Sequence, residues 1–141
     1  GNSAAIDWTM AEIAAWYERL LSQGGPFNVQ LSGGEPCVRD DLPEIIRLGR
    51  EYGFTFFQVN TNGLRLARDV AYLAELKSAG LSTVFLQFDG TDEAIYRTIR
   101  GRELLEKKLA VIENCKKAGV GVVMVFSFLG HKFFSFADRA A

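Results

Sequence analysis

The sequence has few cysteines and histidines, and this shortage excludes several kinds of site. It contains two cysteines, Cys37 and Cys115, which stand far apart in a chain of 141 residues. Two such thiols without a secretory signal are typical of a reducing compartment, so we expect a cytoplasmic protein. The single histidine, His131, lies in a segment without periodicity, so neither a Ser-His-Asp triad nor a histidine metal site is expected.

An excess of one charge and long apolar runs are also lacking. The formal net charge of −1 gives no electrostatic reason to expect nucleic acid as a partner. No apolar run approaches the roughly 20 residues that span a bilayer, so no membrane span is expected. Residues 1–5 lack the basic and apolar regions of a signal peptide, and we interpret them as a cloning remnant.

Glycine is plentiful, and its spacing indicates a repeated unit. A glycine follows each helix-like stretch and precedes a strand-like one, at Gly24, Gly53, Gly80 and Gly119. The separations of 29, 27 and 39 residues suit successive strand–loop–helix units. We expect these glycines to take the left-handed conformation just past a helix end.

The pattern of apolar residues predicts four strands and the helices between them. The strands fall at residues 27–32, 54–60, 83–88 and 120–128. Capping-box spacing marks two helix starts, Thr9 with Glu12 and Asp41 with Glu44. Apolar stripes predict further helices over residues 66–77 and 105–115, and a short one over 92–100. Because helices separate consecutive strands, the strands should be parallel with right-handed crossovers, which is α/β architecture.

One face of this predicted sheet turns polar as the strands approach their carboxyl ends. Its polar members are Asn28, Gln30, Ser32, Gln58, Asn60, Thr83, Gln87 and Asp89. A parallel sheet covered by helices on both sides should be apolar on both faces, and buried unpaired amides are costly. The pattern therefore favours a wet cavity or a ligand at the carboxyl ends. The alternative is a face left in solvent on a partial domain, against which Phe54, Phe56 and Phe85 on the same face argue.

The loop Gly33-Gly34-Glu35-Pro36 follows the first of these strands. Two glycines permit a close backbone approach to a ligand, and Pro36 holds Glu35 towards an extended conformation. The loop thus offers main-chain carbonyls and a carboxylate, groups that suit an ammonium. A tight strand–helix connection without a ligand explains the same residues equally well.

In context the string LSGGEP at residues 31–36 resembles the GGEP motif of the radical S-adenosylmethionine (SAM) superfamily, which holds the SAM amino group. NTNG at 60–63, QFDG at 87–90 and IRG at 99–101 are similar to strings that members carry in this order. The branch it resembles includes MoaA-like and tetraether-lipid-synthase-like proteins. The resemblance implies that residues 6–129 form part of a (β/α)6 partial TIM-type barrel, and it leaves the tail at 130–141 unassigned.

The resemblance also implies a cofactor and the residues that hold it. Gly33, Gly34 and Glu35 would contact the ammonium of SAM. The polar residues at the strand ends would bind the SAM carboxylate, the ribose hydroxyls or a substrate. These residues are Asn60, Asn62, Gln87 and Asp89. In intact members a [4Fe–4S] cluster cleaves SAM to a 5′-deoxyadenosyl radical, which attacks an unidentified substrate.

This chain departs from the family in its cysteines. Members carry three cysteines, spaced C-x3-C-x2-C, ahead of GGEP, whereas no cysteine here precedes Cys37. The cluster is therefore expected only in the intact parent protein, with no metal ligand, no catalytic residue and no activity in this piece. A truncated barrel exposes sheet edges, so self-association is expected. The rival hypothesis is a non-catalytic α/β domain that binds another small molecule or a partner.

Overall fold

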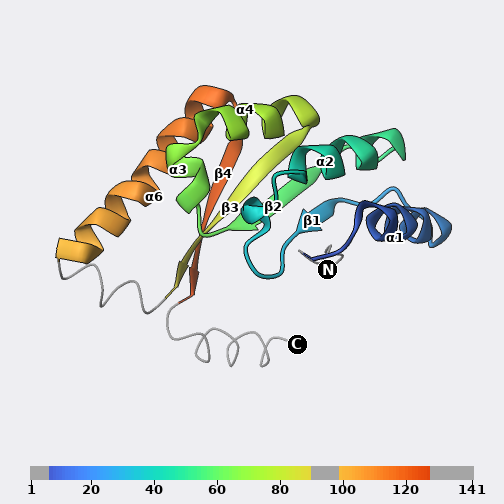
Figure 1. Cartoon of the computed structure of the whole chain (residues 1–141), viewed down its shortest axis with the longest axis horizontal. Helices are drawn as coiled ribbons and strands as arrows, with labels where there is room; N and C mark the ends of the chain where they lie inside the picture. Colours follow the sequence, from blue (N-terminus) through green and yellow to red (C-terminus); the bar gives the residue numbers. More distant parts are fainter. Residues whose placement is uncertain (1–6, 90–98, 128–141) are drawn as a thin grey trace.

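Four parallel strands form the sheet of this protein in the computed structural model, which describes residues 7–89 and 99–127. The strand order is β1-β2-β3-β4, and helices α2, α3, α4 and α6 lie along one face (Figure 1). The elements are α1 (Met10–Ser22), β1 (Val29–Leu31), η1 (Pro36–Val38), α2 (Leu42–Glu51), β2 (Phe57–Thr61), α3 (Leu64–Arg68), α4 (Val70–Ala79), β3 (Leu81–Asp89), α6 (Ile99–Ala118) and β4 (Gly121–Ser127). Adjacent parallel strands joined by helices on one side are the repeating unit of a TIM-type barrel, of which this is a part.

The strands confirm the predicted division of their two faces. The buried parity consists of apolar side chains that pack with the helices: Val29, Leu31, Phe57, Val59, Val84 and Leu86. The opposite parity is only partly buried and holds Gln30, Gln58, Asn60, Phe85 and Gln87. The polar residues predicted within the described strands, Gln30, Gln58, Asn60, Thr83 and Gln87, therefore share one surface of the sheet, opposite the helices. Phe54, which was predicted on the same face, lies before β2 and is buried in the core.

The two predicted capping boxes have different outcomes. At α1 the box is present, since the Glu12 amide donates to Thr9 Oγ1 and the Thr9 amide donates to Glu12 Oε1, both at 3.1 Å. At α2 the predicted box is wrong: Asp41 occupies the N-cap position without a side-chain cap hydrogen bond. Its carboxylate instead accepts two hydrogen bonds from the Arg39 guanidinium, at 2.7 and 2.8 Å. A bidentate ion pair is stronger than a single bond to a main-chain amide.

The predicted helix over residues 66–77 is two helices, α3 and α4. The break falls at Asp69, whose φ of −113° and ψ of 79° are not helical and whose carboxylate caps α4 by accepting from the Tyr72 amide at 3.0 Å. The predicted apolar stripes are also partly wrong, because Val70 is exposed on α4 and Leu109 is exposed on α6. Val111 and Cys115 are the buried apolar residues of α6.

The four glycines predicted at helix ends do have positive φ, from 78° at Gly119 to 126° at Gly80. Other predictions concern residues outside the described ranges. These are the remnant at 1–5, most of the short helix at 92–100, and the tail at 130–141 with His131.

Candidate functional site

The carboxyl ends of β1, β2 and β3 surround a pocket of about 500 Å³. It is lined by Ser32, Gly33, Gly34, Glu35, Asn60, Thr61, Asn62 and Gln87. Six of the seven predicted site residues are among them. The seventh, Asp89, ends β3 opposite Ser127 of β4, and its side chain is outside the described part of the structure.

The first wall of the pocket is the glycine loop after β1. Gly33 and Gly34 have φ values of 93° and 64°, the left-handed region that L side chains rarely adopt. A Cβ on Gly33 would meet no atom within 4 Å, so a side chain there would project into open space beside the pocket. Two glycines are therefore required by the backbone, and they leave the main chain of the loop accessible to a ligand.

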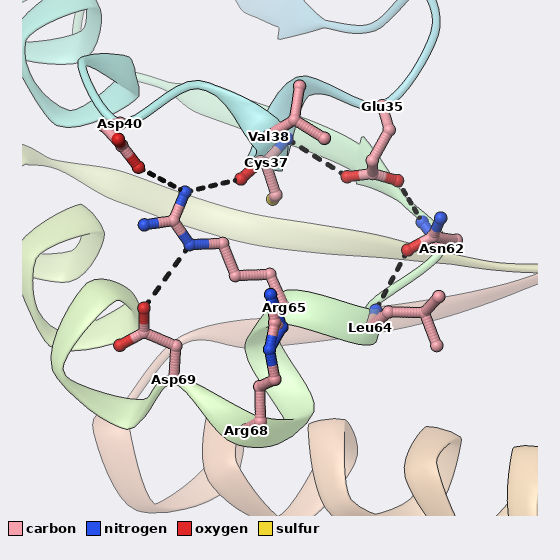
Figure 2. A pocket seen from close by; sticks show the side chains of 9 residues that line it. All are labelled: Glu35, Cys37, Val38, Asp40, Asn62, Leu64, Arg65, Arg68 and Asp69. Atoms are coloured by element: carbon pink, nitrogen blue, oxygen red, sulfur yellow. Dashed lines mark hydrogen bonds and ion pairs between the residues drawn. The ribbon is translucent and has the colours of Figure 1, made fainter.

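Glu35 fastens this loop to the end of β2. Its Oε2 accepts from the Thr61 hydroxyl at 2.6 Å and from the Cys37 amide at 3.1 Å, and its Oε1 accepts from the Asn62 amide at 2.7 Å. Figure 2 shows the carboxylate between the amides of Cys37 and Asn62. Three of the roughly four acceptor positions of a carboxylate are thus occupied within the chain. The main-chain carbonyls of the loop are the acceptors that this arrangement leaves for a ligand.

The second wall is the turn Thr61-Asn62-Gly63 after β2. Thr61, which is almost fully buried, accepts from the Gly63 amide at 3.0 Å while donating to Glu35. Asn62 Oδ1 accepts from the amide of Leu64, the first residue of α3, at 2.9 Å (Figure 2). Thr61 was missed by the sequence analysis, although it stands inside the NTNG string.

Asn60 supplies a polar atom whose bonding capacity is unused. Its Oδ1 is buried and has no hydrogen-bond partner among the described residues. Leaving a buried acceptor unpaired costs about 1–3 kcal/mol, so a ligand that donates a hydrogen bond there would gain from it. Asn60 is the pocket residue whose chemistry most directly indicates a ligand.

Lys108 of α6 lies behind the pocket, and the sequence analysis missed it. Its side chain is almost fully buried, and Nζ donates to the Asn62 carbonyl at 2.6 Å and to the Gln87 carbonyl at 2.7 Å. The signal was available, because Lys108 stands three and seven residues before Val111 and Cys115 and so shares their face of the helix.

A second hollow, of about 600 Å³, lies on the other side of Glu35 (Figure 2). Its central group is Arg65, which pairs with Asp40 at 2.8 Å and with Asp69 at 3.4 Å and donates to the Cys37 carbonyl at 2.9 Å. The guanidinium also stacks 3.6 Å above the Tyr72 ring. This arginine joins η1 to α3 and α4, and its charge is matched inside the chain. The pocket at the strand ends is the better ligand site, because it holds the unpaired acceptor.

The cysteines do not fit an iron–sulfur cluster. Cys37 and Cys115 are buried, and burial raises the pKa of Cys37 to about 12 and that of Cys115 to about 11. A [4Fe–4S] cluster is held by several cysteine thiolates, and Cys37 and Cys115 are the only two cysteines of the chain. Within residues 7–89 and 99–127, no group of three His, Cys, Asp or Glu side chains could hold a metal ion. In the same part of the chain, no helix is both long and apolar enough to cross a membrane.

Comparison with known proteins identifies relatives of most of this chain. The chain is 53% identical over 97 residues to a 7,8-dihydro-6-hydroxymethylpterin dimethyltransferase of Methanocaldococcus jannaschii, an alignment covering 69% of this chain and 19% of that protein. It is 36% identical over 107 residues to a probable GTP 3′,8-cyclase of Methanothermobacter marburgensis, covering 76% of this chain and 34% of the relative. The chain thus spans about a third or less of the length of these relatives.

The family model for the radical SAM superfamily matches residues 3–136. This range includes the glycine loop, the Thr61 turn and the strand ends that surround the pocket. The match agrees with the parallel sheet and with the order of the motifs along it. The chain therefore belongs to the radical SAM superfamily.

Proposed function

We propose that this chain is the SAM-binding portion of a radical SAM enzyme and that the pocket at the ends of β1, β2 and β3 holds SAM. The observation that carries the proposal is the convergence of six predicted residues from three strand ends on one pocket that contains an unpaired buried acceptor, Asn60 Oδ1. A ligand in the pocket would supply the hydrogen-bond partner that such a buried acceptor normally has.

The residues present suit the amino-acid end of SAM. The accessible main-chain carbonyls of the loop at Gly33 and Gly34 would accept from the ammonium, while Glu35 holds that loop against β2. Asn60, Asn62 and Gln87 would serve the SAM carboxylate, the ribose hydroxyls or a substrate, and Asp89 would join them from the end of β3. The work of this chain is to bind and orient SAM and to exclude water from it.

The radical chemistry itself belongs to the intact parent protein. There a [4Fe–4S] cluster held by other residues would supply the electron that cleaves SAM to a 5′-deoxyadenosyl radical. This chain alone is expected to be inactive, and anaerobic reconstitution with iron and sulfide should give no stoichiometric [4Fe–4S] absorbance. The names of the relatives make a dihydropterin and GTP the first compounds to test as substrates of the parent.

The open sheet edges support a proposal about assembly. In the described sheet β1 and β4 are the outer strands, and β4 exposes Val123, Met124 and Phe126. Unpaired strand edges with apolar side chains promote pairing with another chain. We therefore expect copies of this chain to self-associate. We also expect a cytoplasmic location and no nucleic acid partner. Light scattering that shows a clean monomer at high concentration would refute the self-association.

Calorimetry with SAM tests the binding site, and two matched glycine variants sharpen it. Gly33→Ala and Gly53→Ala each place a Cβ at a left-handed position with nothing within 4 Å, at φ values of 93° and 102°. The backbone strain is therefore alike, but only Gly33 lines the pocket. We expect Gly33→Ala to weaken SAM binding by at least about tenfold and Gly53→Ala by less than about twofold. Equal effects of the two variants contradict this location for the site.

The same titration addresses the rival function. If the chain does not bind SAM but binds a different metabolite in this pocket, the result would support the hypothesis of a non-catalytic binding domain instead. Binding of that metabolite should then respond to Gly33→Ala, because the same loop would hold it.

A further inference from the structure

Lys108 occupies the point where β2 and β3 separate. The register of the two strands ends at the pair Thr61 and Leu86, after which β2 turns away into α3 while β3 continues beside β4 to Asp89. The next carbonyls along the two strands are those of Asn62 and Gln87. No strand–strand pairing holds these two peptide groups together, and the Lys108 ammonium donates to both, at 2.6 and 2.7 Å.

The position of this lysine is set from outside the sheet. It comes from α6, 46 residues after Asn62 and 21 after Gln87, and its side chain is 3% exposed. The ammonium also lies 5.4 Å from the centre of the Phe88 ring. A buried cation is tolerated only where acceptors surround it, so the two carbonyls and the lysine hold one another in place.

We infer that Lys108 is a positioning residue for the pocket, acting through the main chain of Asn62 and Gln87. Both residues line the pocket on one side, and both carbonyls bind Lys108 on the other. The lysine therefore sets the distance between the β2 wall and the β3 wall without being a lining residue itself. The part of this inference that concerns SAM rests on the proposed function, whereas the part that concerns the two strand ends does not.

Three variants of the whole chain test the inference. Lys108→Met removes the ammonium but keeps an unbranched side chain. Lys107→Met removes the same charge from the adjacent, exposed position of α6. Leu73→Ala truncates a buried side chain of α4 and so destabilises the fold at a position away from the pocket. The readouts are the carbonyl ¹³C shifts of Asn62 and Gln87, hydrogen exchange at the amides that follow them, urea unfolding, and SAM affinity.

We expect Lys108→Met to move both carbonyl shifts, to speed exchange at Gly63 and Phe88 by at least about tenfold, and to weaken SAM binding by at least about tenfold. Lys107→Met should change none of these, and Leu73→Ala should lower the unfolding midpoint while SAM affinity stays within about twofold. If Lys108→Met does not fold, Lys108→Gln is judged by the same thresholds. Glutamine is neutral, and it carries its donor group on a shorter side chain.

The outcomes separate the two proposals. If the unmodified chain does not bind SAM, the proposed function fails, and Lys108 is judged on the carbonyl shifts and exchange alone. If SAM binds but Lys108→Met loses no more affinity than Leu73→Ala, the positioning role is refuted. Unchanged carbonyl shifts at both Asn62 and Gln87 in a folded variant refute it as well.

Discussion

Replacement of Glu35 is the perturbation whose size is best defined by the structure. Glu35→Ala removes the acceptor of three hydrogen bonds, from the Cys37 amide, the Thr61 hydroxyl and the Asn62 amide. At a net value of roughly 0.5–1.5 kcal/mol for each bond, the free energy of unfolding should fall by about 1.5–4.5 kcal/mol. Most of that loss falls on Thr61, which is 1% exposed and cannot turn to water for a new partner.

Glu35→Gln separates the three bonds. A glutamine keeps one oxygen, which can stay with the Cys37 amide and the Thr61 hydroxyl, while its NH₂ group faces the Asn62 amide, donor against donor. We therefore expect a loss of about 1 kcal/mol, smaller than for alanine. The measurement is urea unfolding followed by circular dichroism, with the slope of the transition compared among variants.

Glu75→Ala is the matched control, since Glu75 is exposed on α4 away from the pocket. It should change the free energy of unfolding by less than about 0.5 kcal/mol. The reasoning is refuted if Glu35→Ala falls within that margin of Glu75→Ala, or if Glu35→Gln is the more damaging of the two Glu35 variants.

Three further predictions follow from single contacts. Gly63→Ala should destabilise by about 3 kcal/mol in urea unfolding, because its φ is 82° and a Cβ would lie 2.5 Å from a Leu86 methyl, whereas Gly53→Ala, with open space around it, should cost about 1 kcal/mol. The ion pair with Arg39 holds the pKa of Asp41 below its ordinary 3.8. The stabilisation that this ion pair gives the fold is therefore complete above pH 3.8 and is lost as the pH falls towards the lowered pKa. An Asp41→Asn variant should show a shallower loss of stability in acid titrations, and an acid profile identical to that of the unmodified chain would contradict this. Burial raises the pKa of both cysteines, so iodoacetamide at pH 8 should alkylate the folded chain at least about tenfold more slowly than the urea-unfolded chain, and equal rates would contradict the buried placement.

Much of the fold was predictable because its signals are local. Alternation along a strand places Val29 and Leu31 on one face and Gln30 on the other whatever the rest of the chain does. A glycine past a helix end takes positive φ for steric reasons within its own residue, as Gly53 does. The two faces of the sheet, its parallel strands and the order of the loops at one end therefore followed from the amino-acid sequence alone.

The contacts inside the site depended on residues distant in the chain, so only the tertiary structure decided them. Glu35 lines the pocket where the sequence predicts a ligand, and its carboxylate also bonds to Thr61 and Asn62, which lie 26 and 27 residues later in the chain. The predicted cap at Asp41 is wrong for a local reason instead, because Arg39, two residues earlier, forms an ion pair with the Asp41 carboxylate. The contacts of Lys108 depend on the packing of α6 beside the ends of β2 and β3. A local pattern specifies conformation and face, whereas the partner of a polar group is set by which elements packing brings within hydrogen-bond distance.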